Sequence, residues 1–262
     1  MASASGEVIV LYDIPSTVPG RAWSANTWKT RIALNYKNIP YRTEWVEFPD
    51  IAPLLTSLGV EPNPPGAFAQ YTLPTIYDPR TRTTVMDSVK IVAYLDETYP
   101  DTPAMFTPPT RTFIHAFQTA LFSNVQEHLS LLLAQSIVAK LNAPSQTYLR
   151  LKLEAIFGCK VEEILTPEQR AERWSNLEKG FSVVASWLEL TGDGRLLLMG
   201  GDGADDGNSL LCHADTSIAG MLIYARAGFG EESEEWQRIE SLDGGRWKRF
   251  LNYFAKWVDT SR

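Results

Sequence analysis

The segments TLPTI, residues 72–76, and DSVKI, residues 87–91, decide the fold of this chain. Proline has no N–H for a β-ladder, so Pro74 fits only at the start or the edge of a strand. If the bond before Pro74 is cis, the backbone of Leu73 faces outward and can pair with an extended peptide. The second segment predicts a helix over residues 88–99, whose first N–H groups and hydroxyl cap can bind a carboxylate.

Together these two motifs match the needs of a γ-glutamyl tripeptide. An extended ligand backbone pairs with Leu73, and a terminal carboxylate binds at the helix start beside Asp87 and Ser88. Either motif alone is explained as well by an ordinary X-Pro turn or an N-capped helix. Their order and spacing, with a third element described below, indicate a glutathione site.

Composition limits the other classes of function. The 262 residues are 44% hydrophobic and 21% charged, which is typical of a globular protein. A net charge of −7 without a basic tract argues against nucleic acid and anionic membranes as partners. Two cysteines and three histidines support neither a disulfide framework nor a metal site. Residues 1–6 lack signal-peptide features and no apolar run approaches ~20 residues, so we expect a cytoplasmic protein.

The first hundred residues alternate between strand-like and helix-like patterns. Compact apolar runs predict four strands, and segments with helical periodicity separate and follow them. The predicted order is βαβαββα, an α/β unit in which helices cover a mixed sheet. The strands are expected at residues 7–12, 41–46, 75–77 and 83–86, and the helices at 26–36, 51–58 and 88–99.

Beyond Tyr99 the pattern is helical throughout. Proline-rich stretches form a linker, and we divide the chain into an α/β domain, 1–105, and an all-α domain, 106–262. A capping box at Thr166 predicts one helix start, whereas residues 149–159 fit either helix or strand. Aromatic side chains of the helical stripes, Phe113 among them, are expected in the core. The periodic segments are 113–132, 166–188, 218–226 and 247–257, and 191–209 is a Gly/Asp-rich loop.

The third element is WSANTWKTRIAL, residues 23–34, between the first strand and the first helix. A loop that enters a helix N-terminus collects N–H donors and the positive end of the helix dipole. A thiolate is stabilised there, and the hydroxyl of Ser24 can donate a hydrogen bond to the thiolate of a bound ligand. Since this hydroxyl does not ionise near neutral pH, it acts as an electrostatic stabiliser and not as a base.

The run S-x-x-x-W-K-T-R-I-A-L, the Leu-Pro-Thr turn and D-S-x-x-I resemble the serine-type cytosolic glutathione transferases. The adjoining NYKNIPYRTEWVEFPDI, residues 35–51, resembles the fungal, etherase-like branch of that superfamily. The resemblance covers the whole chain and implies a thioredoxin-like first domain and an all-helical second domain. It implies that Ser24 activates the thiol of glutathione. The glutathione-binding residues that it implies are Asn26, whose role stays open, Thr72, Leu73, Pro74, Asp87 and Ser88.

The chain also departs from the family pattern. Asp87 stands where Glu is more frequent, and its shorter side chain alters a contact to the ligand's α-amino group. Cys212 replaces the hydroxyl residue that relatives place three positions before Asp215, which predicts a modestly weaker helix cap. A redox role is the alternative interpretation of Cys212. Tyr12 competes with Ser24, because other classes place their activating tyrosine directly after the first strand.

These features predict an enzyme that uses glutathione as co-substrate and directs its thiolate at hydrophobic aromatic electrophiles, aryl ethers included. Eight tryptophans suit a pocket for flat apolar ligands. The alternatives are a ligandin that binds aromatic compounds with little turnover and a glutathione-binding regulatory domain without activity. The resemblance also implies a homodimer, and it places the groups that bind the glycyl carboxylate within residues 53–71.

Overall fold

The computed structural model describes residues 8–106, 110–201 and 210–261. Within these ranges the first domain has the predicted order βαβαββα, and only helices and turns follow it. Glu7 of the first predicted strand, residues 107–109 of the linker and residues 202–209 of the Gly/Asp-rich loop lie outside the described residues. The strands are β1 (Ile9–Asp13), β2 (Tyr41–Trp45), β3 (Thr75–Asp78) and β4 (Thr83–Met86).

The four strands form one mixed sheet in the order β2-β1-β3-β4. β1 is parallel to β2, whereas β3 pairs antiparallel with both β1 and β4. Side chains alternate along β1, so Leu11 packs with Leu95 in one cluster while Tyr12 joins the large core of the molecule. The helices of this domain are α1 (Ala25–Tyr36), α2 (Ile51–Ser57), preceded by the 3-10 turn η1 (Phe48–Asp50), and α3 (Ser88–Thr98).

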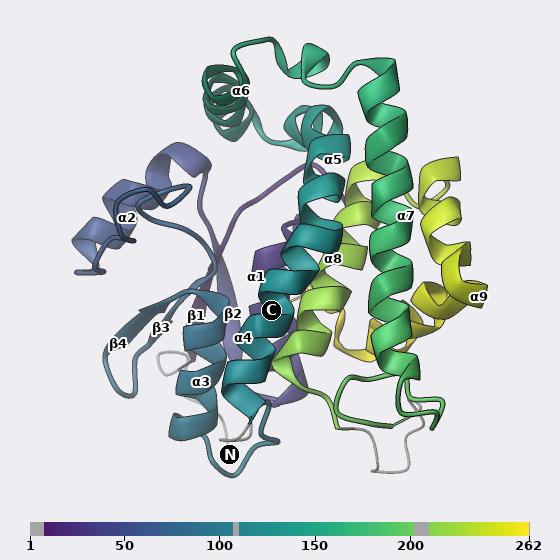
Figure 1. Ribbon diagram of the computed structural model, residues 1–262. Coiled ribbons are helices and arrows are strands. Elements are labelled where there is room, and N and C mark those ends of the chain that lie inside the picture. Colours follow the sequence, from purple (N-terminus) through teal and green to yellow (C-terminus); the bar gives the residue numbers. More distant parts are fainter. Residues whose placement is uncertain (1–7, 107–109, 202–209, 262) are drawn as a thin grey trace.

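The second domain is a helical bundle beside the sheet, and α8 runs between α1 and the other long helices (Figure 1). Thr166 begins α7 with the predicted capping box, because its Oγ1 accepts from the N–H of Gln169 and the Gln169 side chain accepts from the N–H of Thr166. The apolar stripe of α7 is buried as expected. The helices are α4 (Arg111–Leu121), α5 (Glu127–Lys140), α6 (Ala143–Phe157), α7 (Pro167–Glu189), α8 (His213–Phe229) and α9 (Glu234–Phe254).

In the helical domain, one prediction from the sequence is wrong and one ambiguous segment is now assigned. A π-helical turn (Phe122–Gln126) joins α4 to α5, and its wider winding breaks the register of the predicted stripe. Ile114 shares a face of α4 with the buried Leu121, seven residues later, whereas Phe113 is turned away from that face. Phe113 is 73% exposed and Ile114 is buried in its place, so the prediction of a core position for Phe113 is wrong. The ambiguous segment 149–159 is helical up to Phe157, where Gly158 ends α6 with a φ of 69°.

Contacts of α1 with α8 and with the C-terminal segment hold the two domains together. Asn35 donates through Nδ2 to the carbonyl oxygen of Trp257 at 2.7 Å, and Tyr36 meets the Trp257 ring edge-on. Lys37 donates to the carbonyl oxygen of Pro103 in the linker. α1 and α8 form an extensive contact at the domain boundary. In the described part of the chain, no helix is long and apolar enough to cross a membrane.

Candidate functional site

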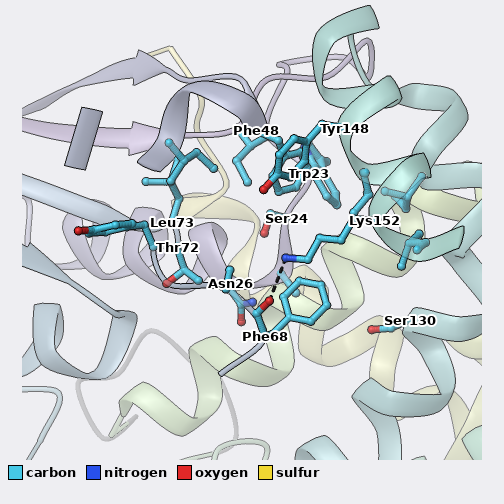
Figure 2. A pocket seen from close by; sticks show the side chains of 18 of the residues that line it. Trp23, Ser24, Asn26, Phe48, Phe68, Thr72, Leu73, Ser130, Tyr148 and Lys152 are labelled. Carbon is cyan, nitrogen blue, oxygen red and sulfur yellow. Dashed lines mark hydrogen bonds between the residues drawn. The ribbon is translucent and has the colours of Figure 1, made fainter. Parts of the chain in front are cut away.

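A pocket of about 510 Å³ lies between the two domains (Figure 2). The first domain contributes the loop before α1, the η1–α2 segment and residues 68–73. The second domain contributes side chains from the π-helical turn, α5, α6 and α8. Four of the predicted site residues line this pocket, namely Ser24, Asn26, Thr72 and Leu73, whereas Pro74, Asp87 and Ser88 are not among its described lining residues.

Ser24 occupies the N-cap position of α1, with φ −70° and ψ 128°. Its carbonyl oxygen accepts from the N–H of Trp28, which starts the helix. Its hydroxyl makes no capping hydrogen bond, although serine favours such a bond at this position. The half-buried hydroxyl therefore lines the pocket at the positive end of the helix dipole without serving as a cap.

Asn26 is held by a lysine that the sequence reading did not single out. The ammonium of Lys29, one turn further along α1, donates to Oδ1 of Asn26 at 2.9 Å. Burial lowers the pKa of Lys29 to about 8, and the negative charge of Asp87 opposes that shift. Because Oδ1 is engaged, the amide NH₂ of Asn26 is the part of the side chain left to donate to a ligand.

The Leu73-Pro74 bond is cis, as expected. Within the described residues, neither the N–H nor the C=O of Leu73 has a backbone hydrogen-bond partner. The carbonyl oxygen of Pro74 accepts from the N–H of Asp87 at 3.2 Å, so the proline turn is bonded directly to the start of α3. The segments 72–76 and 87–91 therefore form one local unit in the structure.

The cap of α3 differs from the expected hydroxyl cap. The carboxylate of Asp87 accepts from the N–H groups of Val89 and Lys90, at 2.9 and 3.2 Å, and is itself the N-cap. Ser88 is the first helical residue and is buried. A carboxylate one position upstream reaches two backbone donors that a hydroxyl on Ser88 cannot reach. Two of the N–H groups expected to bind a ligand carboxylate are therefore already bonded to Asp87.

The competing residues do not face the pocket. Tyr12 is buried on β1, burial raises the pKa of its phenol, and it is absent from the described lining residues. Cys212 is buried at the start of α8, where its N–H donates to Asp215 at 2.9 Å, so the carboxylate half of the capping pair is present. Burial raises the pKa of the Cys212 thiol far above its usual value, which does not suit a redox nucleophile.

An aromatic wall crosses the domain boundary inside the pocket. Trp23 meets Phe48 edge-on at 6.4 Å and Tyr224 of α8 at 5.9 Å between ring centroids. Phe48 in turn stacks on Tyr148 of α6 at 5.9 Å, with 7° between the ring planes. These four residues, here called the aromatic wall, suit a flat apolar ligand. Sequence reasoning treated Trp23 as packing alone, because the pocket forms only when residues from both domains meet.

One charged residue of the pocket was not predicted from the sequence. Lys152 of α6 lines the pocket and donates to the carbonyl oxygen of Phe68 at 2.9 Å, the dashed line in Figure 2. Its signal in the sequence is weak, since a lysine in an ambiguous apolar segment is normally solvated. Among the described residues, no group of three or more His, Cys, Asp or Glu is arranged to hold a metal ion.

Comparison with known proteins gives the class. A model of the N-terminal domain of glutathione S-transferases matches residues 23–98, and a model of their C-terminal domain matches residues 112–257. A glutathione S-transferase-like protein of Aspergillus flavus, ustS, is 30% identical in an alignment of 259 positions that covers 95% of this chain and 90% of that protein. The chain belongs to the glutathione S-transferase family.

Two fungal crystal structures are similar over nearly their full length. The glutathione S-transferase CsGST63524 of Ceriporiopsis subvermispora, in complex with glutathione, is 39% identical, with a TM-score of 0.89 over 96% of this chain and 98% of that chain. The glutathione transferase GSTFuA3 of Phanerochaete chrysosporium is 40% identical, with a TM-score of 0.87 over 97% and 98% of the two chains. The TM-scores show that this chain has the same overall fold as both structures.

Proposed function

We propose that this protein is a serine-type glutathione transferase in which Ser24 stabilises the thiolate of bound glutathione. The observation that supports this role is the hydroxyl of Ser24, which lines the pocket at the N-terminus of α1 and makes no capping hydrogen bond. Leu73, with its unpaired backbone, lies in the same lining set and suits the cysteinyl unit of glutathione. A relative with glutathione bound, of the same fold, supports glutathione as the co-substrate.

The chemistry follows from the position of the hydroxyl. The glutathione thiol loses its proton to solvent, and Ser24 donates a hydrogen bond to the resulting thiolate sulfur. The sulfur attacks an electrophilic carbon of the second substrate, and a leaving group departs with the bonding electrons, or an unsaturated acceptor takes them. The pocket's apolar lining favours hydrophobic, aromatic electrophiles. Cleavage of aryl ethers, by analogy with the etherase-like branch, is one such substitution.

Replacing Ser24 by Ala tests the role of its hydroxyl. We expect kcat at neutral pH to fall about tenfold to several hundredfold, as for loss of one preorganised donor. The affinity for glutathione stays nearly unchanged, and the pKa of the bound thiol, followed by thiolate absorbance, rises. Ser241→Ala on the exposed surface of α9 is the matched control and keeps full activity. If Ser24→Ala is fully active while Tyr12→Phe is inactive, the protein is a tyrosine-type transferase instead.

The second candidate function is that of a ligandin, and the aromatic wall favours it. Four neighbouring rings, in stacked, tilted and edge-on contacts, suit the binding of flat compounds without any need for turnover. Quenching of tryptophan fluorescence by aromatic compounds, measured beside turnover of a panel of electrophiles, separates the two functions. Tight quenching without turnover identifies a ligandin, whereas turnover that depends on Ser24 identifies the transferase.

Assembly and location are part of the proposal. On the family resemblance we propose a cytoplasmic homodimer in which the first domain of one subunit contacts the second domain of its partner. We keep the domain boundary at residues 105 and 106, between α3 and α4. Light scattering of the purified protein tests the dimer, since a monomer mass at micromolar concentration contradicts it.

A further inference from the structure

Lys152 is the sole formally charged side chain among the described residues that line the pocket. The segment on the opposite side, residues 43–79, contains no lysine, arginine or histidine. A cation for an anionic ligand therefore has to come from another part of the chain. Lys152 supplies it from the second domain, near the middle of α6.

The ammonium group of Lys152 is only partly satisfied by the protein. One of its three N–H groups donates to the carbonyl oxygen of Phe68 at 2.9 Å. The nitrogen also lies 3.9 Å from the centroid of the Phe68 ring, which is an aromatic and not an anionic contact. Among the described residues it forms no ion pair, and burial alone lowers its pKa. A partly buried cation without a counter-ion is stabilised further by a ligand that carries a negative charge.

The residues around Lys152 indicate what kind of negatively charged ligand fits there. Tyr148, one turn earlier on α6, belongs to the aromatic wall and stacks on Phe48. Leu149 and Leu153 of the same helix also line the pocket. Figure 2 shows the Lys152 side chain extending from α6 into the pocket beside the ring of Phe68. The surroundings are therefore an aromatic slot with one cation at its side.

We propose that the second-ligand site selects aromatic compounds that carry a carboxylate, and that Lys152 binds this carboxylate while the aromatic wall holds the ring. This inference rests on the proposed function, because it assigns the substrate class of the same pocket. Two free N–H groups of the ammonium can bind the two carboxylate oxygens while the bond to Phe68 persists. Lys152 is a specificity-determining residue, distinct from the thiolate stabiliser Ser24.

A matched pair of ligands tests the inference. 2-Naphthoate and its methyl ester have the same ring, and only the acid carries a charge at neutral pH. Their affinities are measured by quenching of tryptophan fluorescence with saturating glutathione, for the wild type, Lys152→Met and Lys152→Arg. Lys179→Met, an exposed site on α7, removes the same net charge outside the pocket and is the control.

We expect the wild type to bind the acid more tightly than the ester. Lys152→Met should lower the affinity for the acid about tenfold to a hundredfold, as for loss of a charged hydrogen bond. The affinity of Lys152→Met for the ester should change less than about twofold. Lys152→Arg should largely restore the affinity for the acid, and Lys179→Met should bind both ligands as the wild type does. The inference is overturned if Lys152→Met lowers the affinities for the acid and for the ester equally. It is also overturned if Lys152→Met weakens only glutathione, because the lysine then binds the glycyl carboxylate.

The same measurements separate this inference from the proposed function. A wild type that binds glutathione and turns over an electrophile through Ser24, yet shows no preference for the acid, contradicts the role of Lys152 alone. A wild type that binds no glutathione contradicts the transferase and, with it, the substrate class. Thermal unfolding of each variant identifies one that fails to fold, and Lys152→Gln then replaces Lys152→Met in the comparison.

Discussion

Lys29 and Arg31 are two buried cations of α1 that differ in their partners. Arg31 forms an ion pair with Asp13 at 2.8 Å, and both side chains are fully buried. The guanidinium also donates to Thr43 and lies over the ring of Trp45. Lys29, in contrast, donates a hydrogen bond to the amide oxygen of Asn26 and forms no ion pair of that kind among the described residues. Arg31 therefore stabilises the first domain, whereas Lys29 keeps Asn26 oriented at a cost in desolvation.

The lowered pKa of Lys29 predicts a dependence of stability on pH. Its pKa is about 8 in the folded chain and 10.5 when unperturbed, so the unfolded chain binds more protons between these values. The free energy of unfolding of the wild type, relative to Lys29→Met, should therefore rise with pH over this window. The rise should approach about 3 kcal/mol. Urea denaturation of both proteins at pH 8 and pH 10.5 measures it, and parallel pH profiles contradict the assignment.

At the scale of elements, the start of α3 combines a turn and a helix cap. Asp87 has a φ of 89°, a left-handed value that is uncommon for a residue other than glycine. This conformation lets its N–H reach the carbonyl oxygen of Pro74 while its carboxylate caps the helix. Asp87 thus caps α3, and we propose Ser88 for direct contact with glutathione.

A pair of alanine substitutions separates these two roles. Asp87→Ala should lower the free energy of unfolding without glutathione by about 1–2 kcal/mol, through loss of the cap. Ser88→Ala should change that free energy of unfolding by less than about 0.5 kcal/mol relative to the wild type. It should weaken the binding of glutathione by about 1–2 kcal/mol, through loss of a charge-assisted hydrogen bond. Urea denaturation and calorimetry measure the two quantities. Unchanged glutathione affinity in Ser88→Ala removes Ser88 from the site.

At the scale of the whole molecule, the position of Ser24 depends on the contact between α1 and α8. Gly220 of α8 faces the start of α1, and a Cβ added there would lie 2.4 Å from the carbonyl oxygen of Ala25. Ala25 directly follows Ser24, so the contact with α8 determines where the loop that carries Ser24 lies. The missing side chain of Gly220 allows the two backbones to approach.

Gly220→Ala tests this dependence. In an isolated helix alanine is favoured over glycine by about 1 kcal/mol, but here the clash with Ala25 should destabilise the protein by about 1–3 kcal/mol. We also expect kcat to fall, because the start of α1 moves. Gly228→Ala on the same helix meets the flexible Leu133 side chain and is the control for stability alone. Equal kcat in the two variants would show that the α1–α8 contact does not position Ser24.

Much of the fold follows from local patterns in the sequence. The apolar strand β1, the Leu73-Pro74 turn and the capping box at Thr166 each depend on residues near one another in the chain. Local sterics and hydrogen bonds determine such elements, so the order βαβαββα followed by helices could be predicted. Ser24 and Leu73, which line the pocket, could be proposed as site residues for the same reason, because a helix start and a proline turn are short-range features.

Only the tertiary structure decided which side chains meet in the pocket. The aromatic wall forms only when Trp23 and Phe48 of the first domain meet Tyr148 of α6 and Tyr224 of α8. Lys152 of α6 likewise reaches the carbonyl oxygen of Phe68 in the first domain. Phe113 is exposed because α4 packs against its neighbours through the face that carries Ile114 and Leu121. These arrangements depend on contacts between residues far apart in the chain, and the periodicity of a single segment carries no information about its distant partners.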